Sequence, residues 1–217
     1  MTGRVWDLPT RLFHWSLVVL FGLGWWSAET GRDTVHFWSG YGLLFGLLFR
    51  LLWGVVGSST ARFASFVRGP GAGLRYLRSG WREPLVGHNP LGALSVVAML
   101  ALLLAQVGLG VVATDEDGLA AGPLAMAVSM DASDCARELH ELNFDVLRII
   151  IGLHIAAVLF YWLFLKKPLI GPMVTGRSTL DAETAMQPAP MRRALACAAI
   201  ALAVTAWIVA GAPPIGG

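Results

Sequence analysis

The chain has 217 residues, of which 56% are hydrophobic and 14% are charged, and its mean hydropathy is +0.64. Soluble domains carry about 25% charged residues, so this balance argues against a soluble domain and indicates a protein that has membrane lipid around it. The formal net charge is only +2, and the basic residues form no continuous stripe, which argues against a nucleic-acid partner.

Five apolar stretches predict an all-α integral membrane protein. Each approaches the ~20 residues that a ~30 Å hydrocarbon core requires, and aromatic residues gather near their ends, as they do at membrane interfaces. The first stretch contains tryptophans and lacks an Ala-x-Ala cleavage site, so we expect a retained helix and no signal peptide. In chain order the stretches are Leu12 to Ala28, Val35 to Val56, Leu91 to Ala113, Leu142 to Leu165 and Leu195 to Ala210.

The charges between these stretches alternate and predict the topology. The segment before the first stretch and the second and fourth connections are basic, whereas the first connection has Arg32 beside two acids and the third has seven acids against Arg137. By the positive-inside rule the N-terminus is cytoplasmic and the C-terminus lies outside.

Two connections suggest particular structures. The Gly-rich and Arg-rich second connection, up to Arg82, is either an interfacial segment on anionic headgroups or a solvated basic loop. The polar, Pro-containing fourth connection predicts a linker. We therefore divide the chain into a four-helix bundle at 1–175, a cytoplasmic linker at 176–191 and a C-terminal transmembrane helix at 192–217.

The histidines carry the main functional signal, because ionisable side chains inside a membrane are rare. His140 and His154 are 14 residues apart, about 40° short of four full helical turns, so both project from one face. They are separated by ~21 Å along the helix axis and cannot serve one metal centre. The predicted topology matches His36 in depth with His140 near the outer surface, and His14 with His154 towards the cytoplasm.

This pattern predicts two b-type haems, each held by two histidines. They would be bound non-covalently, because no Cys-x-x-Cys-His run exists. A single intramembrane histidine more often hydrogen-bonds a neighbouring helix, and that alternative stays open for each residue alone. We interpret Cys135 and Cys197, predicted on opposite sides, as unpaired.

Other residues have two readings each. Arg148, between the two histidines of the fourth stretch, would be compensated by haem propionates or by Asp145. Arg50 either snorkels at the inner boundary or binds a propionate. His88 is either an interfacial histidine or, with Arg11, part of a quinone site near the inner haem.

Four motifs of the sequence are familiar, namely Val5 to Trp15, Arg50 to Gly54, His88 to Gly92, and His140-Glu141 followed by Gly152 to His154. They resemble the prokaryotic cytochrome b561 family, which includes the b-type cytochrome subunits of nickel-iron hydrogenases. The resemblance covers about residues 4–175 and implies a four-helix bundle with two haems ligated from helices one, two and four. It also implies electron transfer in a bacterial inner membrane, with the quinone pool at one end of the path.

The sequence leaves several partners and functions open. The acidic third connection would attract a basic redox protein such as a c-type cytochrome, or is a solvated loop. The chain would act alone as a quinol-linked electron carrier, as a homodimer, or as the haem-bearing anchor of a larger dehydrogenase or hydrogenase complex. A divalent-metal transporter is the weaker alternative, because the apolar stretches hold few carboxylates beyond Asp145.

Overall fold

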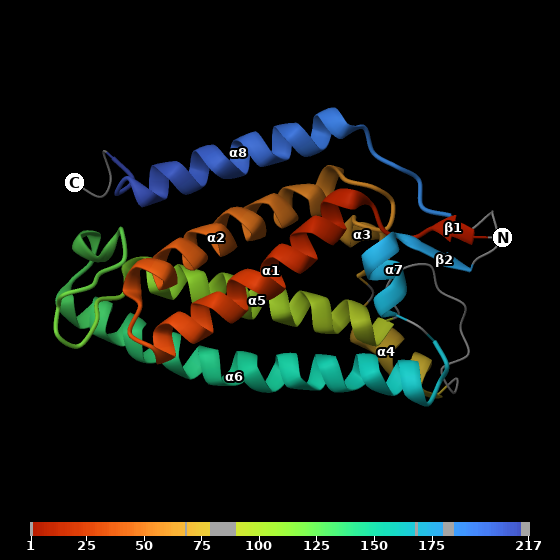
Figure 1. Ribbon diagram of the computed structural model, residues 1–217, viewed down its shortest axis with the longest axis horizontal. Helices are drawn as coiled ribbons and strands as arrows, with labels where there is room; N and C mark the ends of the chain where they lie inside the picture. Colours follow the sequence, from red (N-terminus) through yellow and green to blue (C-terminus); the bar gives the residue numbers. More distant parts are fainter. Residues whose placement is uncertain (1, 68, 79–89, 168, 180–184, 214–217) are drawn as a thin grey trace. The chain divides into compact units, whose positions relative to one another are not determined.

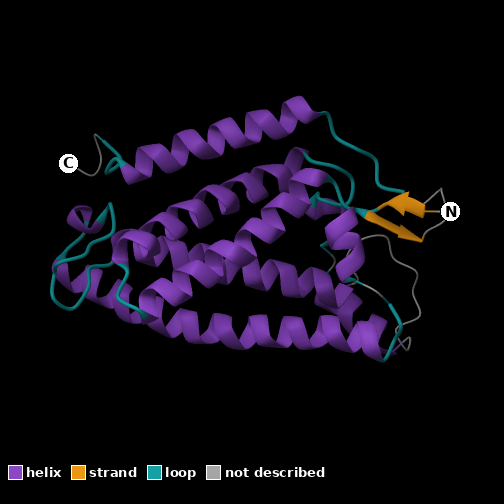
Figure 2. Ribbon diagram, viewed as in Figure 1, coloured by secondary structure: helices purple, strands orange, loops and turns teal. Residues whose placement is uncertain are grey.

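The computed structural model describes residues 2–67, 69–78, 90–167, 169–179 and 185–213 (Figure 1). This part of the chain is helical apart from one small antiparallel sheet, in which Arg4 lies opposite Arg177 (Figure 2). The elements are β1 (Thr2–Arg4), α1 (Leu8–Glu29), α2 (Asp33–Val56), α3 (Phe63–Phe66), α4 (Pro70–Arg78), α5 (Pro90–Val112), η1 (Ala125–Ala127), α6 (Met130–Leu163), α7 (Ile170–Thr175), β2 (Arg177–Thr179) and α8 (Met191–Val209).

Four of the described helices are long and apolar enough to cross a membrane, namely α2, α5, α6 and α8. The bounds of α2, α5 and α8 lie within a few residues of the predicted stretches. The first predicted stretch forms the 22-residue helix α1, which is not among those four and contains Arg11. The predicted number of five spans therefore stays a prediction.

Helix α6 differs most from its predicted stretch. It begins at Met130, well before the expected start at Leu142, and the hydroxyl of Ser129 caps it by accepting the Ala132 amide at 3.3 Å. Its first turns are rich in charged residues, so a hydropathy pattern predicts a loop there. Ala, Glu, Arg and Leu are nevertheless good helix formers. His140 therefore lies inside a helix, not at its outer end.

Two segments expected to be irregular contain regular structure. The second connection forms helix α4 up to Arg78, and residues 79–89, which include His88, lie outside the described residues. The predicted linker begins with strand β2, which pairs with β1. Strands of three residues are too short to leave a pattern of alternating polarity.

The fold divides into two compact units, and each long helix contributes to both. Unit 1 comprises residues 1–13, 50–100 and 150–195, and unit 2 comprises residues 14–49, 101–149 and 196–217. In unit 2 the rings of Phe21 and Trp25 on α1 contact Phe144 on α6, at centroid distances of 5.8 and 5.7 Å. Asn143 on α6 donates to the Leu102 carbonyl on α5 at 3.0 Å.

Asp7 organises the start of α1 in unit 1. Its Oδ1 accepts the Thr10 amide at 2.7 Å, which caps the helix. Its Oδ2 accepts the indole N–H of Trp53 at 3.0 Å and the hydroxyl of Ser58. One carboxylate therefore links the first motif of the sequence to the end of α2.

Candidate functional site

His36 of α2 and His140 of α6 face each other in unit 2. Their ring centroids are 6.2 Å apart, and the ring planes are inclined by 71°. A metal–imidazole bond is about 2.0 Å long, and the ring centroid lies about 1.1 Å further on, so two imidazoles on opposite sides of one metal have centroids about 6 Å apart. The centroid spacing of His36 and His140 is close to that value.

The orientation of both rings is set by backbone carbonyls. His36 Nδ1 lies 3.0 Å from the Gly24 carbonyl on α1, and His140 Nδ1 lies 2.9 Å from the Gln106 carbonyl on α5. A carbonyl oxygen can only accept, so each Nδ1 carries the proton. In a neutral imidazole this leaves the Nε2 lone pair free to bind a metal.

Sequence reasoning missed the residues that support His140. Asn143 Nδ2 donates to Gln106 Oε1 at 2.6 Å, which ties α6 to α5 one turn from the histidine. A Cβ added at Gly110 would lie 3.0 Å from His140 Cε1, so only glycine leaves the ring its present place against α5. The available signal was the two amide side chains, Gln106 and Asn143, in or beside apolar stretches.

The inner histidines are placed on the expected helices. His154 is half-buried on α6 in unit 1, and His14 is half-buried on α1 in unit 2, where its ring makes an edge contact with Trp15 at 5.0 Å. Helix α6 carries both His140 and His154, as the spacing argument requires. The pairing of His14 with His154 joins residues of different units and stays a prediction.

Arg50 is buried, which contradicts the snorkelling alternative and leaves propionate binding as a prediction. The residue is only 3% exposed, and its guanidinium stacks over the Phe63 ring at 4.6 Å. Its Nη1 is buried and has no hydrogen-bond partner among the described residues. A buried cationic N–H group without an acceptor fits an acidic cofactor group such as a haem propionate. Snorkelling fails because α3 covers this end of α2.

Arg148 has a partner within the protein. Its side chain is 42% exposed, makes an ion pair with Asp145 and lies over the Phe144 ring at 5.2 Å. Asp145 was one of the two compensating groups expected. A role for Arg148 at a haem stays a prediction.

The two residues of the predicted quinone site are not both described. His88 lies outside the described residues, and Arg11 donates through Nη1 to the Val174 carbonyl at 2.6 Å in unit 1. Both cysteines are free, with Cys135 exposed and Cys197 buried. That agrees with their expected unpaired state.

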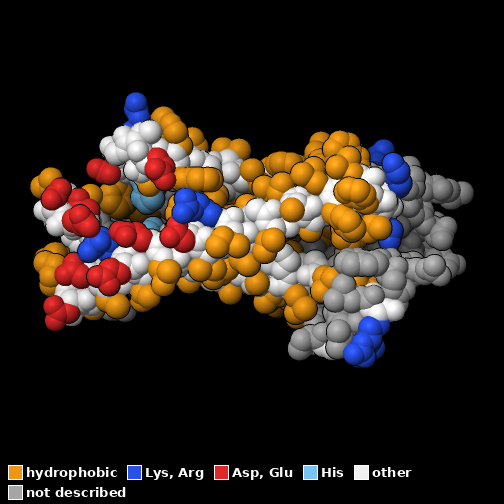
Figure 3. All heavy atoms as spheres, turned by 90° about the horizontal axis from the view of Figure 1, so that it is seen from below, with side chains coloured by type: hydrophobic (Ala, Val, Ile, Leu, Met, Phe, Trp, Pro, Cys, Tyr) orange, Lys and Arg blue, Asp and Glu red, His pale blue; other side chains and the backbone are white. Residues whose placement is uncertain are grey.

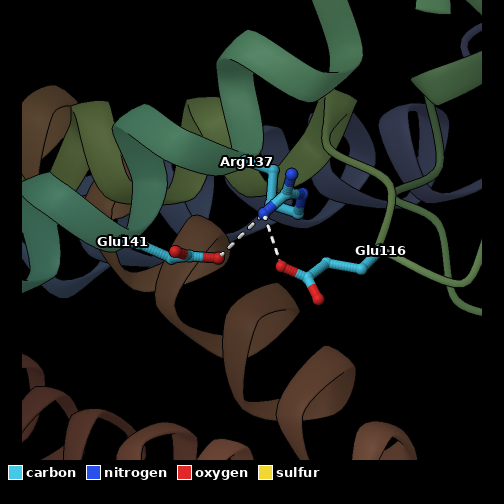
Figure 4. Close-up of polar contacts among 3 residues, drawn as sticks. All are labelled: Glu116, Arg137 and Glu141. Carbon is cyan, nitrogen blue, oxygen red and sulfur yellow. Dashed lines mark hydrogen bonds and ion pairs between the residues drawn. The ribbon is translucent and has the colours of Figure 1, made fainter.

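Unit 2 is strongly acidic around the facing histidines. Its ranges hold ten of the 14 Asp and Glu residues of the chain but three of the 16 Lys and Arg residues. One of those three cations, Arg137, bridges Glu116 and Glu141 at 3.4 Å each (Figure 4). Figure 3 shows the acidic side chains gathered on one part of the surface, with histidine side chains visible among them.

Across the described ranges, no group of three or more His, Cys, Asp or Glu residues is arranged to hold a metal ion. The histidine pair would instead offer two imidazole nitrogens, a donor set that suits an iron porphyrin. A family model described as prokaryotic cytochrome b561 matches residues 5–176. No curated protein and no solved structure matches the chain.

Proposed function

This chain belongs to the prokaryotic cytochrome b561 family, and from that premise we propose that it carries electrons across the bilayer through two b-type haems. Membership makes it a multi-pass membrane cytochrome of the b type that acts in electron transfer. The proposal adds the number of haems, their ligands and the quinone. It also adds the location in the inner membrane, with a cytoplasmic N-terminus.

His36 and His140 hold the outer haem in this proposal, and His14 and His154 hold the inner one. The single observation that carries it is the facing pair of rings, 6.2 Å apart, with each Nδ1 on a backbone carbonyl. When bound, the haem iron supplies the one-electron chemistry. The protein fixes the ring orientation and offers Arg50 to an acidic haem group.

The acidic surface of unit 2 supports a basic redox partner on the outer side, such as a c-type cytochrome. Arg137 is engaged by Glu116 and Glu141, so it does not neutralise the other carboxylates of this surface. A surface of one charge sign steers an oppositely charged protein towards the nearby haem. Electrons from quinol would enter at the inner side, where Arg11 and His88 are the proposed quinone residues.

A second candidate keeps the haems and makes the chain the anchor subunit of a larger dehydrogenase or hydrogenase complex. Direct oxidation of a soluble quinol by the isolated protein distinguishes the two. A divalent-metal transporter would require metal-binding clusters of protein side chains, and none occurs among the described residues.

The haem count tests the proposal. We expect the purified protein to bind two haems in a reduced-minus-oxidised spectrum with a pyridine haemochrome assay. The variants His36→Ala and His140→Ala should each lose the same haem, because both nitrogens are needed for six-coordinate iron. His88→Ala is the matched control and should keep two. Retention of both haems by His36→Ala and His140→Ala would refute the outer pair.

A further inference from the structure

Unit 1 contains a cavity of about 700 Å³ that lies outside the proposed haem sites. Arg4, Arg11 and Arg177 are among the residues that line it, together with Asp7. Its other walls include Trp6 and further apolar side chains at the start of α1 and α8. A volume of 300–1,000 Å³ is usual for small-molecule sites, so the cavity has room for a ligand.

Among the described residues that line this cavity, Asp7 is the only acidic one. Both oxygens of Asp7 already accept hydrogen bonds, from Thr10, Trp53 and Ser58. Arg4 and Arg177 are directly opposite each other across the β1–β2 pair, an arrangement that is destabilising for like charges. Both side chains are exposed, so water screens part of this repulsion, and an anion between or beside them would relieve the rest.

Arg11 adds a third cation with unused hydrogen-bonding capacity. One of its terminal nitrogens donates to the Val174 carbonyl, but its Nε is buried without a partner among the described residues. Gly176, at φ +79°, turns the chain tightly here, and a Cβ at this position would lie 3.2 Å from Arg11 Nη1. The backbone therefore leaves space for the guanidinium beside the cavity.

The position of the cavity along the chain indicates its depth in the membrane. It is lined by Leu8 and Met191, the first residues of α1 and of the apolar helix α8. Residues at the start of an apolar helix lie at the level of the lipid headgroups. The forked guanidinium groups match the oxygens of a phosphate, whereas a neutral quinone would leave their charge uncompensated.

We propose that this cavity binds a phosphate group, supplied by the headgroup of an anionic phospholipid or by a soluble phosphate. The apolar walls and the depth favour the lipid. The site contains none of the proposed haem ligands, and it shares Arg11 with the proposed quinone site. Lipid bound there links β1, α1 and β2 through one shared anion, because Arg4, Arg11 and Arg177 belong to these elements.

The experiment uses the full-length, haem-loaded protein in a neutral detergent. Dioctanoyl phosphatidylglycerol, dioctanoyl phosphatidylcholine and inorganic phosphate are titrated separately, and the apparent melting temperature and bound lipid by native mass spectrometry are recorded. We expect phosphatidylglycerol at saturation to raise the melting temperature by about 3 °C or more. Phosphatidylcholine should have little effect, because its choline cation faces three arginines.

The double variant R4Q/R177Q should bind phosphatidylglycerol at least about tenfold more weakly, because charge-assisted hydrogen bonds are lost. The matched control is R75Q/R192Q, which removes two exposed arginines outside the cavity and should bind as the parent does. Arg177→Lys keeps the charge without the fork and should weaken binding several-fold, which provides a milder variant if the double variant does not fold.

The probes separate the two sources. Greater stabilisation by phosphatidylglycerol than by inorganic phosphate assigns the site to lipid, and equal stabilisation assigns it to soluble phosphate. Absence of binding by both overturns the proposal. Equal losses in R4Q/R177Q and R75Q/R192Q, or stabilisation by a short-chain ubiquinone but not by phosphatidylglycerol, overturn it as well.

Discussion

Gly110→Ala should weaken haem binding at the outer site while leaving the helix intact. The new Cβ would lie 3.0 Å from His140 Cε1 and 3.2 Å from Nδ1. Carbon atoms in good contact are about 3.5–4.0 Å apart, so the ring must move by several tenths of an ångström. The ring cannot move freely, because its Nδ1 is held by the Gln106 carbonyl at 2.9 Å.

The expected magnitude follows from the steric clash. Overpacking costs about 1–3 kcal/mol, whereas the better helix propensity of alanine stabilises the haem-free and haem-bound protein alike and leaves haem affinity unchanged. In the haem-free protein the imidazole can rotate away from the methyl group, but with iron bound it cannot. We therefore expect haem affinity at this site to fall about tenfold, since 1.4 kcal/mol corresponds to one factor of ten.

Gly108→Ala is the matched control, on the same helix two residues away. A Cβ there would have nothing within 4 Å, so only the gain in helix propensity remains. The assay is haem transfer to an excess of a soluble apo-globin, followed by absorbance. We expect one haem to leave Gly110→Ala faster and Gly108→Ala to behave as the parent. Equal haem retention by the two variants would refute the steric argument.

Two further predictions concern stability and partner binding. Asp7→Ala should lower the free energy of unfolding by about 3 kcal/mol, because it removes a helix cap and two hydrogen bonds to a carboxylate. Titration with a denaturing detergent measures this change. The exposed control Asp134→Ala should change the free energy of unfolding by less than about 0.5 kcal/mol. Arg137→Gln should change the free energy of unfolding by less than about 1 kcal/mol, since both carboxylate partners of Arg137 are well exposed. The same variant should accelerate electron transfer to a basic c-type cytochrome in stopped-flow measurements at low salt. A slower or salt-independent rate would contradict the steering role of the acidic surface.

The apolar helices could be predicted because burial in lipid imposes a minimum run of apolar residues. Helices α2, α5 and α8 begin and end near the expected residues for that reason. The start of α6 could not be found in this way, since its first turns are exposed and charged. Helix propensity and the cap at Ser129 decide that boundary, and neither changes hydropathy.

The closeness of His36 and His140 could be predicted from topology. The direction of each helix is enough to show that the two histidines lie at the same depth. Their hydrogen bonds to Gly24 and Gln106 could not be predicted, because a backbone acceptor depends on helix rotation and has no side-chain signature. The burial of Arg50 was missed for a related reason. The ring that covers it, Phe63, belongs to a short helix beyond the next turn.

The length of α6 has a consequence for how fast charge can leave the protein. Its 34 residues extend for about 51 Å, whereas the hydrocarbon layer is only about 30 Å thick. The apolar part begins at Leu142, so the turns before it stand clear of the lipid tails. Under the proposed ligation, a redox centre anchored at His140 would be close to bulk water, and a visiting carrier would need no relay to exchange an electron with it.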